Sequence, residues 1–286
     1  MPKLDLRNAI RIKGAGGEIV SLKGQGFEWV RPVSDPILAY FQSTGADGAY
    51  YPVWDKSTLF QDVDGTVPVE NHNDPVALSL DISGNGLHRR QPVSTRRPQY
   101  RTDGVLHWLW YDGIDDLLYT DRPFLHNPLG ATVIVGLDLS TSAHDRRYLF
   151  EGMSTSGNQT TDFYSPIQTR DNDYGCFFRP SSRPNPLSLL SNIRAENAEY
   201  LITTVDDPIA EIFSMRGNRG LHAGSVGLAK GTINTNTTSF GGVRRDTESL
   251  FVTGREFGFV GVSHVLDNAD IEQFENYLVD STGLTL

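Results

Sequence analysis

The residues best suited to chemistry lie in one short stretch, residues 108–116, which reads WLWYDGIDD. Alternate side chains of a β-strand point to opposite faces, so Trp108 and Trp110 are predicted to share one face and Leu109 and Tyr111 the other. An outward Trp110 can stack against a sugar ring or pack in a contact between subunits. The sequence does not separate these two roles.

Three carboxylates, Asp112, Asp115 and Asp116, follow this predicted strand. Carboxylate oxygens are ligands that Ca²⁺ accepts, and the three are close enough in the chain to share one cation. Aspartates also accept hydrogen bonds from the amides of tight turns, and Asp112–Gly113 is a turn signal of β-hairpins. We expect the turn role here, with no cofactor required, and keep a calcium site at these residues as the alternative.

Further aromatic and basic residues are candidates for binding. Trp54, Tyr50 and Tyr51 are expected in loops or at outward strand positions, where they would contact a glycan. Five arginines crowd one proline-containing stretch, namely Arg89, Arg90, Arg96, Arg97 and Arg101. They could bind anionic glycans or phosphates, but we expect them to pair with acidic neighbours in this or another subunit, because guanidinium groups match carboxylates well.

The segment 81–86, DISGNG, imitates the start of a calcium loop but has Pro92 where the twelfth position needs a glutamate, so it is predicted to be a tight turn. Motifs of hydrolytic enzymes are absent from the sequence. No glutamate begins the Glu-x-Asp-x-x-Glu pattern of sandwich-fold glucanases, and there is no Gly-x-Ser-x-Gly, His-Glu-x-x-His or Walker motif. We therefore predict no catalytic residues and no enzyme.

Short apolar runs broken by glycine and proline predict an all-β chain. Runs at 10–12 and 18–22 flank the turn 14–17, and others lie at 105–111, 131–139, 148–150, 200–205, 211–215 and 256–262. A single helix is predicted near the end, capped by Asp267 or Asn268, with Ile271, Phe274 and Leu278 on one face and a stop at residues 282–283. This order of elements favours a two-sheet antiparallel sandwich with one C-terminal helix.

The chain has 286 residues and a net charge of −10, which argues against nucleic-acid binding. No apolar run is long enough to insert into a membrane, and the polar start predicts no secretory signal. The proline-containing stretch 32–36 is predicted to be a linker. It would divide a small basic β module (1–33) from an acidic body (34–286). The module is too small to have its own core, so we expect it to attach to the body or to another protein.

The segment 55–119 resembles the concanavalin A-like, or laminin-G-like, jelly-roll domains of tailed-phage virion proteins. The resemblance rests on LFQD at 59–62, GT at 65–66, PV at 68–69, DPV at 74–76, Asp81, SGNG at 83–86, RP at 97–98, YRTDG at 100–104 and DGIDD at 112–116. Tyr111 stands where that family has phenylalanine. The C-terminal strand and helix are similar to the family's ending, and the first 33 residues look like short β modules that anchor virion proteins.

This resemblance implies a jelly-roll domain on a virion surface, made in the cytoplasm of a bacterial host. The expected partners are other virion proteins, bound through the N-terminal module, further copies of the same chain, and host surface glycans bound by Trp110, Trp54, Tyr50 and Tyr51. Two alternatives stay open: a structural decoration or joining protein without a ligand, and a polysaccharide depolymerase. The depolymerase predicts two carboxylates about 5–9.5 Å apart in a cleft.

Overall fold

The computed structural model describes most of the chain. The described residues are 9–14, 17–22, 27–29, 35–125, 130–140, 147–153, 163–170, 173–179, 187–194, 198–207, 209–221, 226–227, 235–244 and 248–284. Residues 32–34 of the predicted linker (32–36), and with them the boundary between residues 33 and 34, lie outside these ranges.

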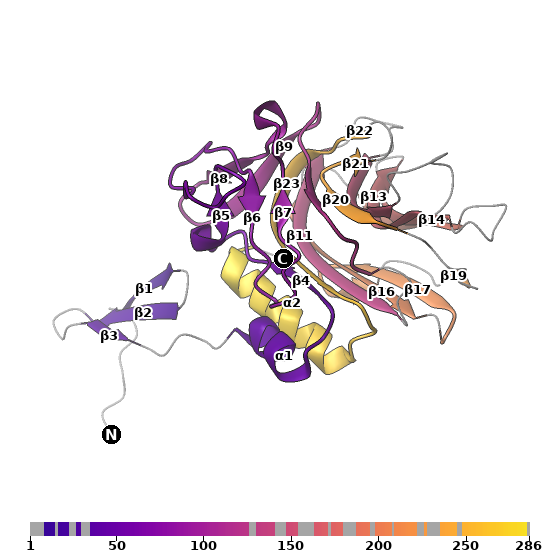
Figure 1. Ribbon diagram of the computed structural model, residues 1–286. Coiled ribbons are helices and arrows are strands. Elements are labelled where there is room, and N and C mark those ends of the chain that lie inside the picture. Colours follow the sequence, from indigo (N-terminus) through magenta and orange to yellow (C-terminus); the bar gives the residue numbers. More distant parts are fainter. Residues whose placement is uncertain are drawn as a thin grey trace, which may run out of the picture.

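The main body is a sandwich of two antiparallel sheets, each with nine strands in the described ranges (Figure 1). Sheet I runs in the order β5 (Leu59–Phe60), β6 (Leu78–Ser79), β7 (Arg89–Arg90), β10 (Leu118–Thr120), β20 (Thr237–Phe240), β12 (Arg147–Met153), β13 (Phe163–Arg170), β14 (Asp173–Arg179) and β15 (Leu187–Arg194). Neighbours at both ends of this order are consecutive in the chain, whereas the three pairings in the middle, β7 with β10, β10 with β20 and β20 with β12, join strands that are not consecutive.

Sheet II has the two longest strands at its centre, β23 (Thr253–Val262) and β11 (Ala131–Ser140). Its order is β8 (Gln99–Thr102), β9 (His107–Asp112), β23, β11, β16 (Tyr200–Asp207), β17 (Ile212–Gly217) and β18 (Gly220–Leu221), while β4 (Gly48–Tyr51) also pairs with β23 and β19 (Val226–Gly227) with β17. One edge of β23 therefore pairs first with β9 and then with β4.

Smaller elements complete the described chain. They are a three-stranded sheet of β1 (Ala9–Gly14), β2 (Gly17–Leu22) and β3 (Phe27–Trp29), a pair of β21 (Val243–Arg244) and β22 (Glu248–Ser249), and the short 3₁₀ helices η2 (Lys56–Thr58) and η3 (Ser94–Arg96). The predicted hairpin around residues 14–17 is confirmed, because Gly14 pairs with Gly17.

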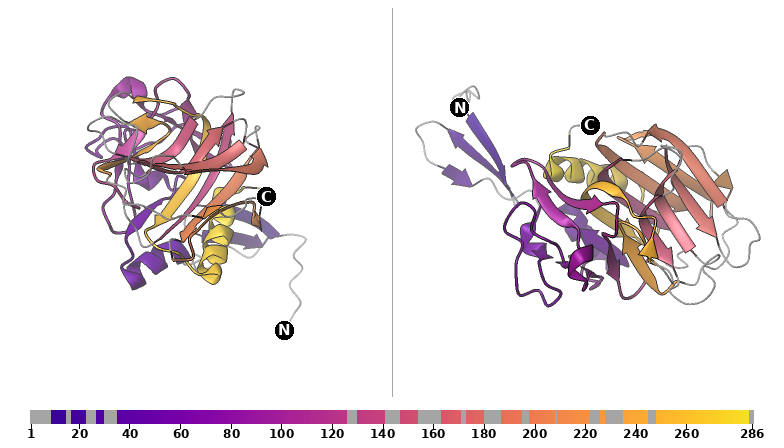
Figure 2. Two further views of the ribbon diagram at one scale, coloured as in Figure 1. Left: turned by 90° about the vertical axis from the view of Figure 1, so that its right-hand side faces the viewer. Right: turned by 90° about the horizontal axis from the view of Figure 1, so that it is seen from above.

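Two helices lie against the outer face of sheet II. They are α1 (Pro36–Thr44) and α2 (Asn268–Thr282), and Figure 2, in which α2 is yellow, shows them on one side of the sandwich. The stripe Ile271, Phe274 and Leu278 is buried against the sheet. Asp267 caps the start of α2 by accepting a hydrogen bond from the Asp270 amide, and Gly283 ends it in the left-handed conformation (φ 78°). None of the described helices is long and apolar enough to cross a bilayer.

Helix α1 was not predicted from the sequence. Its signals are present: Asp35 accepts hydrogen bonds from the amides of Ile37 and Leu38, Pro36 occupies the first turn, and Gly45 ends the helix. The two prolines in residues 32–36 predict an extended linker, because each restricts the backbone around it. The second proline instead starts a helix, where a missing amide hydrogen costs nothing.

An aromatic cluster fills the space between the sheets. The ring centroids of Phe150, Phe240 and Phe259 lie 5.1–5.2 Å apart, within the range of favourable edge and offset contacts. A second apolar cluster lies between sheet II and the two helices. The predicted all-β sandwich with a small N-terminal β element and a C-terminal helix is confirmed.

Candidate functional site

The alternation predicted for residues 108–111 is confirmed. Leu109 and Tyr111 are buried between the sheets, and Trp108 and Trp110 are half-buried on the opposite, outer face of sheet II. In register, Trp110 lies between Gln99 on β8 and Arg255 on β23. The sheet therefore surrounds the outward tryptophans with long polar side chains.

Arginines pack on the outward tryptophans. The Arg101 guanidinium lies 4.7 Å from the centre of the Trp110 ring, and its Nη2 donates to Gln99 Oε1 at 2.8 Å. The Arg255 guanidinium lies 5.4 Å from the Trp108 ring. Arginine over an aromatic ring is a favourable contact that also holds the guanidinium in place. We call the set Gln99, Arg101, Trp108, Trp110 and Arg255 the Trp–Arg face.

Acidic groups hold Arg255 from the other side. Its Nε donates to Asp138 Oδ2 at 3.0 Å, and its Nη1 lies 3.3 Å from Glu199 Oε1. The Nε1 of Trp108 is buried and has no hydrogen-bond partner among the described residues. The Trp–Arg face thus combines flat apolar rings with fixed donors and acceptors, which suits a polar ligand with an apolar face.

Sequence reasoning missed Gln99 and Arg255 as members of this face. Strand β23 reaches β9 across more than 140 residues, and nothing in the local pattern around Arg255 predicts which strand it pairs with. Arg101 was recognised only as one of five crowded arginines. Its stacking on Trp110 depends on the pairing of β8 with β9.

Three of the four aromatic residues proposed for glycan contact are buried, so the expectation that they face outward was wrong. Tyr50 and Tyr51 are completely buried, because β4 pairs with β23 inside the fold. Tyr51 packs in the core between the sheets, and Tyr50 lies under the helices with its hydroxyl donating to Asp35 Oδ2 at 2.9 Å. Trp54 is 9% exposed and packs near Tyr277 of α2.

The crowded arginines mostly pair with acids of the same chain. Arg89 is buried and its Nη1 lies 2.6 Å from Glu256 Oε1, while Arg90 pairs with Asp121 and Arg96 with Glu248. Arg97 instead donates to backbone carbonyls, among them that of Gln61 at 3.0 Å. The expected pairing with acids is confirmed for three of the five, and within one chain.

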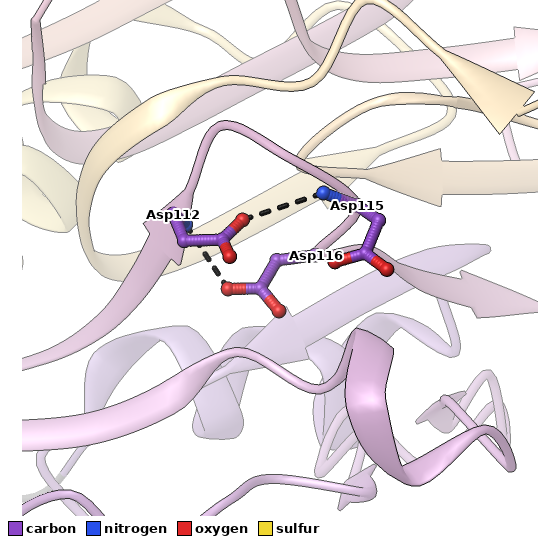
Figure 3. Close-up of side chains that lie close together, drawn as sticks. All are labelled: Asp112, Asp115 and Asp116. Carbon is purple, nitrogen blue, oxygen red and sulfur yellow. Dashed lines mark hydrogen bonds between the residues drawn. The ribbon is translucent and has the colours of Figure 1, made fainter.

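The three aspartates after β9 converge, as Figure 3 shows, with one carboxylate oxygen of each within 4.8 Å of the others. Asp112 Oδ1 accepts from the amides of Ile114 (2.8 Å) and Asp115 (3.4 Å), and Asp116 Oδ2 accepts from the Asp112 amide at 3.0 Å. The predicted turn role is confirmed. The same oxygens could hold a cation, so calcium binding stays a prediction.

Asp116 has an unusual protonation equilibrium. Burial, followed by the negative charge of Asp112, raises its pKa from 3.8 to about 7. A group with this pKa is only about half ionised at neutral pH. Protonation relieves repulsion among the three carboxylates, whereas a bound cation would require Asp116 to be ionised.

The turn after Asp112 does not form the predicted hairpin. Strand β9 pairs with β8 and β23 in sheet II, whereas β10 pairs with β7 and β20 in sheet I. The Asp112–Gly113 turn, with Gly113 at φ 80°, therefore carries the chain from one sheet to the other. The local sequence predicts the turn but not which strands flank it.

The segment 81–86 is a turn, as predicted. Asp81 Oδ1 accepts from the amides of Ser83 (2.9 Å) and Tyr50 (3.0 Å), and its Oδ2 accepts from the Leu87 amide at 2.9 Å. Gly84 and Gly86 have positive φ angles. Protein donors occupy this carboxylate, so it organises the loop.

Comparisons with known proteins identify the class of fold. No protein-family model matches this chain, and a search of curated proteins finds no match. Among solved structures, the receptor-binding domain of botulinum neurotoxin D is similar with a TM-score of 0.51 and 12% identity, over 69% of this chain and 49% of that one. This likeness shows the fold, a two-sheet β-sandwich.

Weaker similarities are to two sialidases. The NanB sialidase from Streptococcus pneumoniae matches with a TM-score of 0.45 and 14% identity over 52% of this chain, which spans only 24% of NanB. The CBM40 domain of Ruminococcus gnavus IT-sialidase, bound to α2,3-sialyllactose, matches with a TM-score of 0.44 and 12% identity over 56% of this chain and 85% of that one.

Proposed function

We propose that this chain is a lectin-like protein of a tailed-phage virion surface, and that it binds host glycans through the Trp–Arg face. The observation that carries the proposal is the outward pair of tryptophans set among fixed guanidinium and amide groups. Sugar rings have apolar faces that pack on indole rings and hydroxyls that bond to arginine and glutamine side chains. The fold alone would not decide this, because β-sandwiches host many functions.

The remaining parts of the proposal come from the sequence resemblance. The N-terminal module would attach the protein to other virion proteins, several copies would assemble, and synthesis would take place in the host cytoplasm. Weak binding at each Trp–Arg face becomes effective when many copies on one particle engage a polysaccharide together. We propose binding without cleavage, since the sequence carries no glycosidase motif.

A glycan array probed with the full-length chain tests the function. Trp110→Ala is expected to weaken binding about tenfold or more, because one aromatic platform is lost. Tyr119→Ala is the matched control, since Tyr119 is also a half-buried aromatic with an arginine, Arg244, 3.7 Å from its ring centre, but it belongs to sheet I. Absence of binding by the wild-type chain would remove the glycan-binding proposal, as would equal losses in both variants.

A structural role without a ligand is the second candidate. Tryptophan and arginine are enriched in protein interfaces, so the same face suits a contact between subunits. High-resolution imaging of assembled particles distinguishes the two: Trp110 covered by a neighbouring subunit favours the structural role, and a solvent-facing Trp110 favours glycan binding. Release of reducing sugar from host polysaccharide, abolished by Asp116→Asn, would instead indicate a depolymerase.

A further inference from the structure

A pocket of about 570 Å³ opens on the outer face of sheet I, on the opposite sheet from the Trp–Arg face. Register places Phe60, Leu78 and Arg90 on the same side of β5, β6 and β7, because Phe60 pairs with Leu78 and Leu78 with Arg90. Their neighbours Leu59, Ser79 and Arg89 point into the sandwich and are buried. The pocket thus belongs to the outward set of side chains, and its volume lies in the range of small-molecule sites.

The floor of the pocket is apolar. It consists of Phe60, Leu78 and Leu80, of which Leu78 is 9% exposed; Leu87 also lines the pocket but packs mainly in the core between the sheets. An apolar floor of this kind favours a ligand that has at least one face of C–H groups, because water is displaced from both surfaces on contact.

The rim of the pocket is polar and carries charges of both signs. Its charged members are Arg90, Arg122, Asp64 and Asp121, two cations and two anions. Arg90 and Asp121 form an ion pair, and their side chains are 45% and 56% exposed. The four formal charges cancel. An anionic ligand would meet the two carboxylates and a cationic ligand the two guanidinium groups, so an uncharged ligand with many hydroxyls fits best.

His88 adds a donor with a defined orientation. The Asp81 amide donates to His88 Nδ1 at 3.0 Å, so in the neutral ring the proton lies on Nε2. His88 is exposed and lines the pocket. The rim therefore offers guanidinium and imidazole donors beside carboxylate acceptors, which is the mixture that sugar hydroxyls require.

Both loops that wall the pocket are held in place by aspartates. Asp62 Oδ1 accepts from the amides of Thr66 and Val67, each at 2.9 Å, which fixes the turn containing Asp64 and Gly65. Asp81 fixes the opposite loop that leads to Leu87 and His88, through the bonds described above. A site that is formed before binding loses little conformational entropy when it takes up a ligand.

We propose that this pocket binds a single uncharged pyranose residue of a glycan, its C–H face on the apolar floor and its hydroxyls on the rim. The inference rests on the proposed glycan-binding function and gives it a second, separate site. The Trp–Arg face would hold a stretch of polysaccharide along an open surface, whereas the pocket would select one sugar residue.

Saturation-transfer NMR on the full-length chain tests binding in the pocket. The neutral probes are methyl glycosides of hexoses, deoxyhexoses and N-acetylhexosamines. The charged probes are glycosides of glucuronic acid and sialic acid. At least one neutral glycoside is expected to bind the wild-type chain more strongly than either charged probe. Val63→Trp should remove the pocket's share of this signal by filling the pocket, because Val63 lines it and is 37% exposed. Arg90→Ala should weaken binding about tenfold or more by removing a charged donor.

Three controls make the outcomes separable. Val93→Trp places the same bulky ring at a site that is 46% exposed and outside the pocket, and Arg219→Ala removes an exposed arginine elsewhere. Trp110→Ala removes the Trp–Arg platform. Val93→Trp and Arg219→Ala should bind the monosaccharide as the wild type does, whereas Trp110→Ala should lose only binding at the Trp–Arg face and keep the part of the signal that Val63→Trp removes. Unchanged thermal unfolding midpoints would confirm that the pocket variants are folded.

The inference is overturned if no neutral glycoside binds the wild type, if a charged glycoside binds best, or if Val63→Trp binds normally. Polysaccharide binding is measured on the same samples. Loss of monosaccharide binding in Trp110→Ala, with Val63→Trp unaffected, would refute the pocket and leave the proposed function standing. Polysaccharide binding that fails in every sample, including the wild type, would refute the function itself.

Discussion

The buried ion pair between Arg89 and Glu256 connects the two sheets and gives the sharpest prediction about this fold. Arg89 lies on β7 of sheet I and Glu256 on β23 of sheet II, and their side chains are 0% and 1% exposed. Glu256 also accepts from the Tyr111 hydroxyl at 3.0 Å, and the Arg89 guanidinium lies 4.0 Å from the centre of the Tyr51 ring. Burial is the largest single influence and would lower the pKa of Arg89, but Glu256, Tyr111 and Tyr51 together outweigh it and raise that pKa.

Removing Glu256 and removing Arg89 have different consequences for stability. The arginine that remains cannot lose its proton, whereas the glutamate that remains can take one up. Glu256→Gln keeps the shape and an acceptor for Tyr111 but leaves a buried cation without its counter-charge. We expect it to lower the free energy of unfolding by about 3–5 kcal/mol, with little dependence on pH between about 5 and 8.

Arg89→Met leaves a buried carboxyl that escapes its unpaired charge by protonation. A glutamate side chain in water has a pKa of about 4.3, so holding the proton costs about 3.7 kcal/mol at pH 7 and about 1 kcal/mol at pH 5. In the variant the folded state binds one proton more than the unfolded state. Its free energy of unfolding should therefore rise, relative to wild type, by about 2.7 kcal/mol when the pH falls from 7 to 5.

Urea unfolding followed by tryptophan fluorescence measures both effects, at several pH values and with unchanged denaturant slopes as the check on two-state behaviour. The double variant Arg89→Met/Glu256→Leu is the control, and we expect it to be more stable than Glu256→Gln because no charge is buried. A loss below about 1 kcal/mol in Glu256→Gln, or an Arg89→Met variant without this pH dependence, would refute the reasoning.

Four further predictions concern Asp116, calcium at the three carboxylates, Gly258 and Asp35. Asp116 in the folded state holds its proton more tightly than in the unfolded state, so the wild-type free energy of unfolding falls as pH rises from about 4 to 7. The fall is at most about 1.4 kcal/mol per pH unit, and less where solvent screens the carboxylates. Asp116→Asn should remove this pH dependence, which is measured from urea midpoints at several pH values. If the three carboxylates hold Ca²⁺, adding it should raise the thermal midpoint of the wild type above pH 7 but not near pH 5, and not that of the variant. Gly258→Ala should cost about 1–3 kcal/mol, because the new Cβ would lie 2.5 Å from Cζ3 of Trp54 and because Gly258 has a φ of 158° that L residues rarely adopt. Trp54→Phe in the same chain should recover part of this cost in thermal unfolding, and no recovery would contradict the contribution of Trp54. Asp35→Ala should lower the free energy of unfolding by about 2–3 kcal/mol, because it removes both the cap of α1 and the partner of the buried Tyr50 hydroxyl. Adding Tyr50→Phe to the same chain should recover part of this loss in thermal unfolding.

Much of the sandwich could be predicted from the sequence, because its signals are local. Alternating apolar residues mark β9, β11, β16 and β23, and the stripe on α2 with Asp267 before it and Gly283 after it marks the helix and its ends. The same signals around α1 were overlooked because the prolines at 32 and 36 were interpreted together. The strands β13, β14 and β15 were not predicted individually.

The faces of the binding residues were only partly predictable. The sequence by itself determined that Trp110 and Leu109 point in opposite directions, because strand periodicity is a property of the backbone. Only the tertiary structure decided that Tyr50 and Tyr51 are buried, since both faces of β4 are covered, one by sheet I and the other by the helices. Strand pairing likewise decided that Arg101 and Arg255 flank the tryptophans, and that the turn at Asp112 joins two sheets. Such contacts join residues far apart in the chain, and no local pattern encodes which strands will meet.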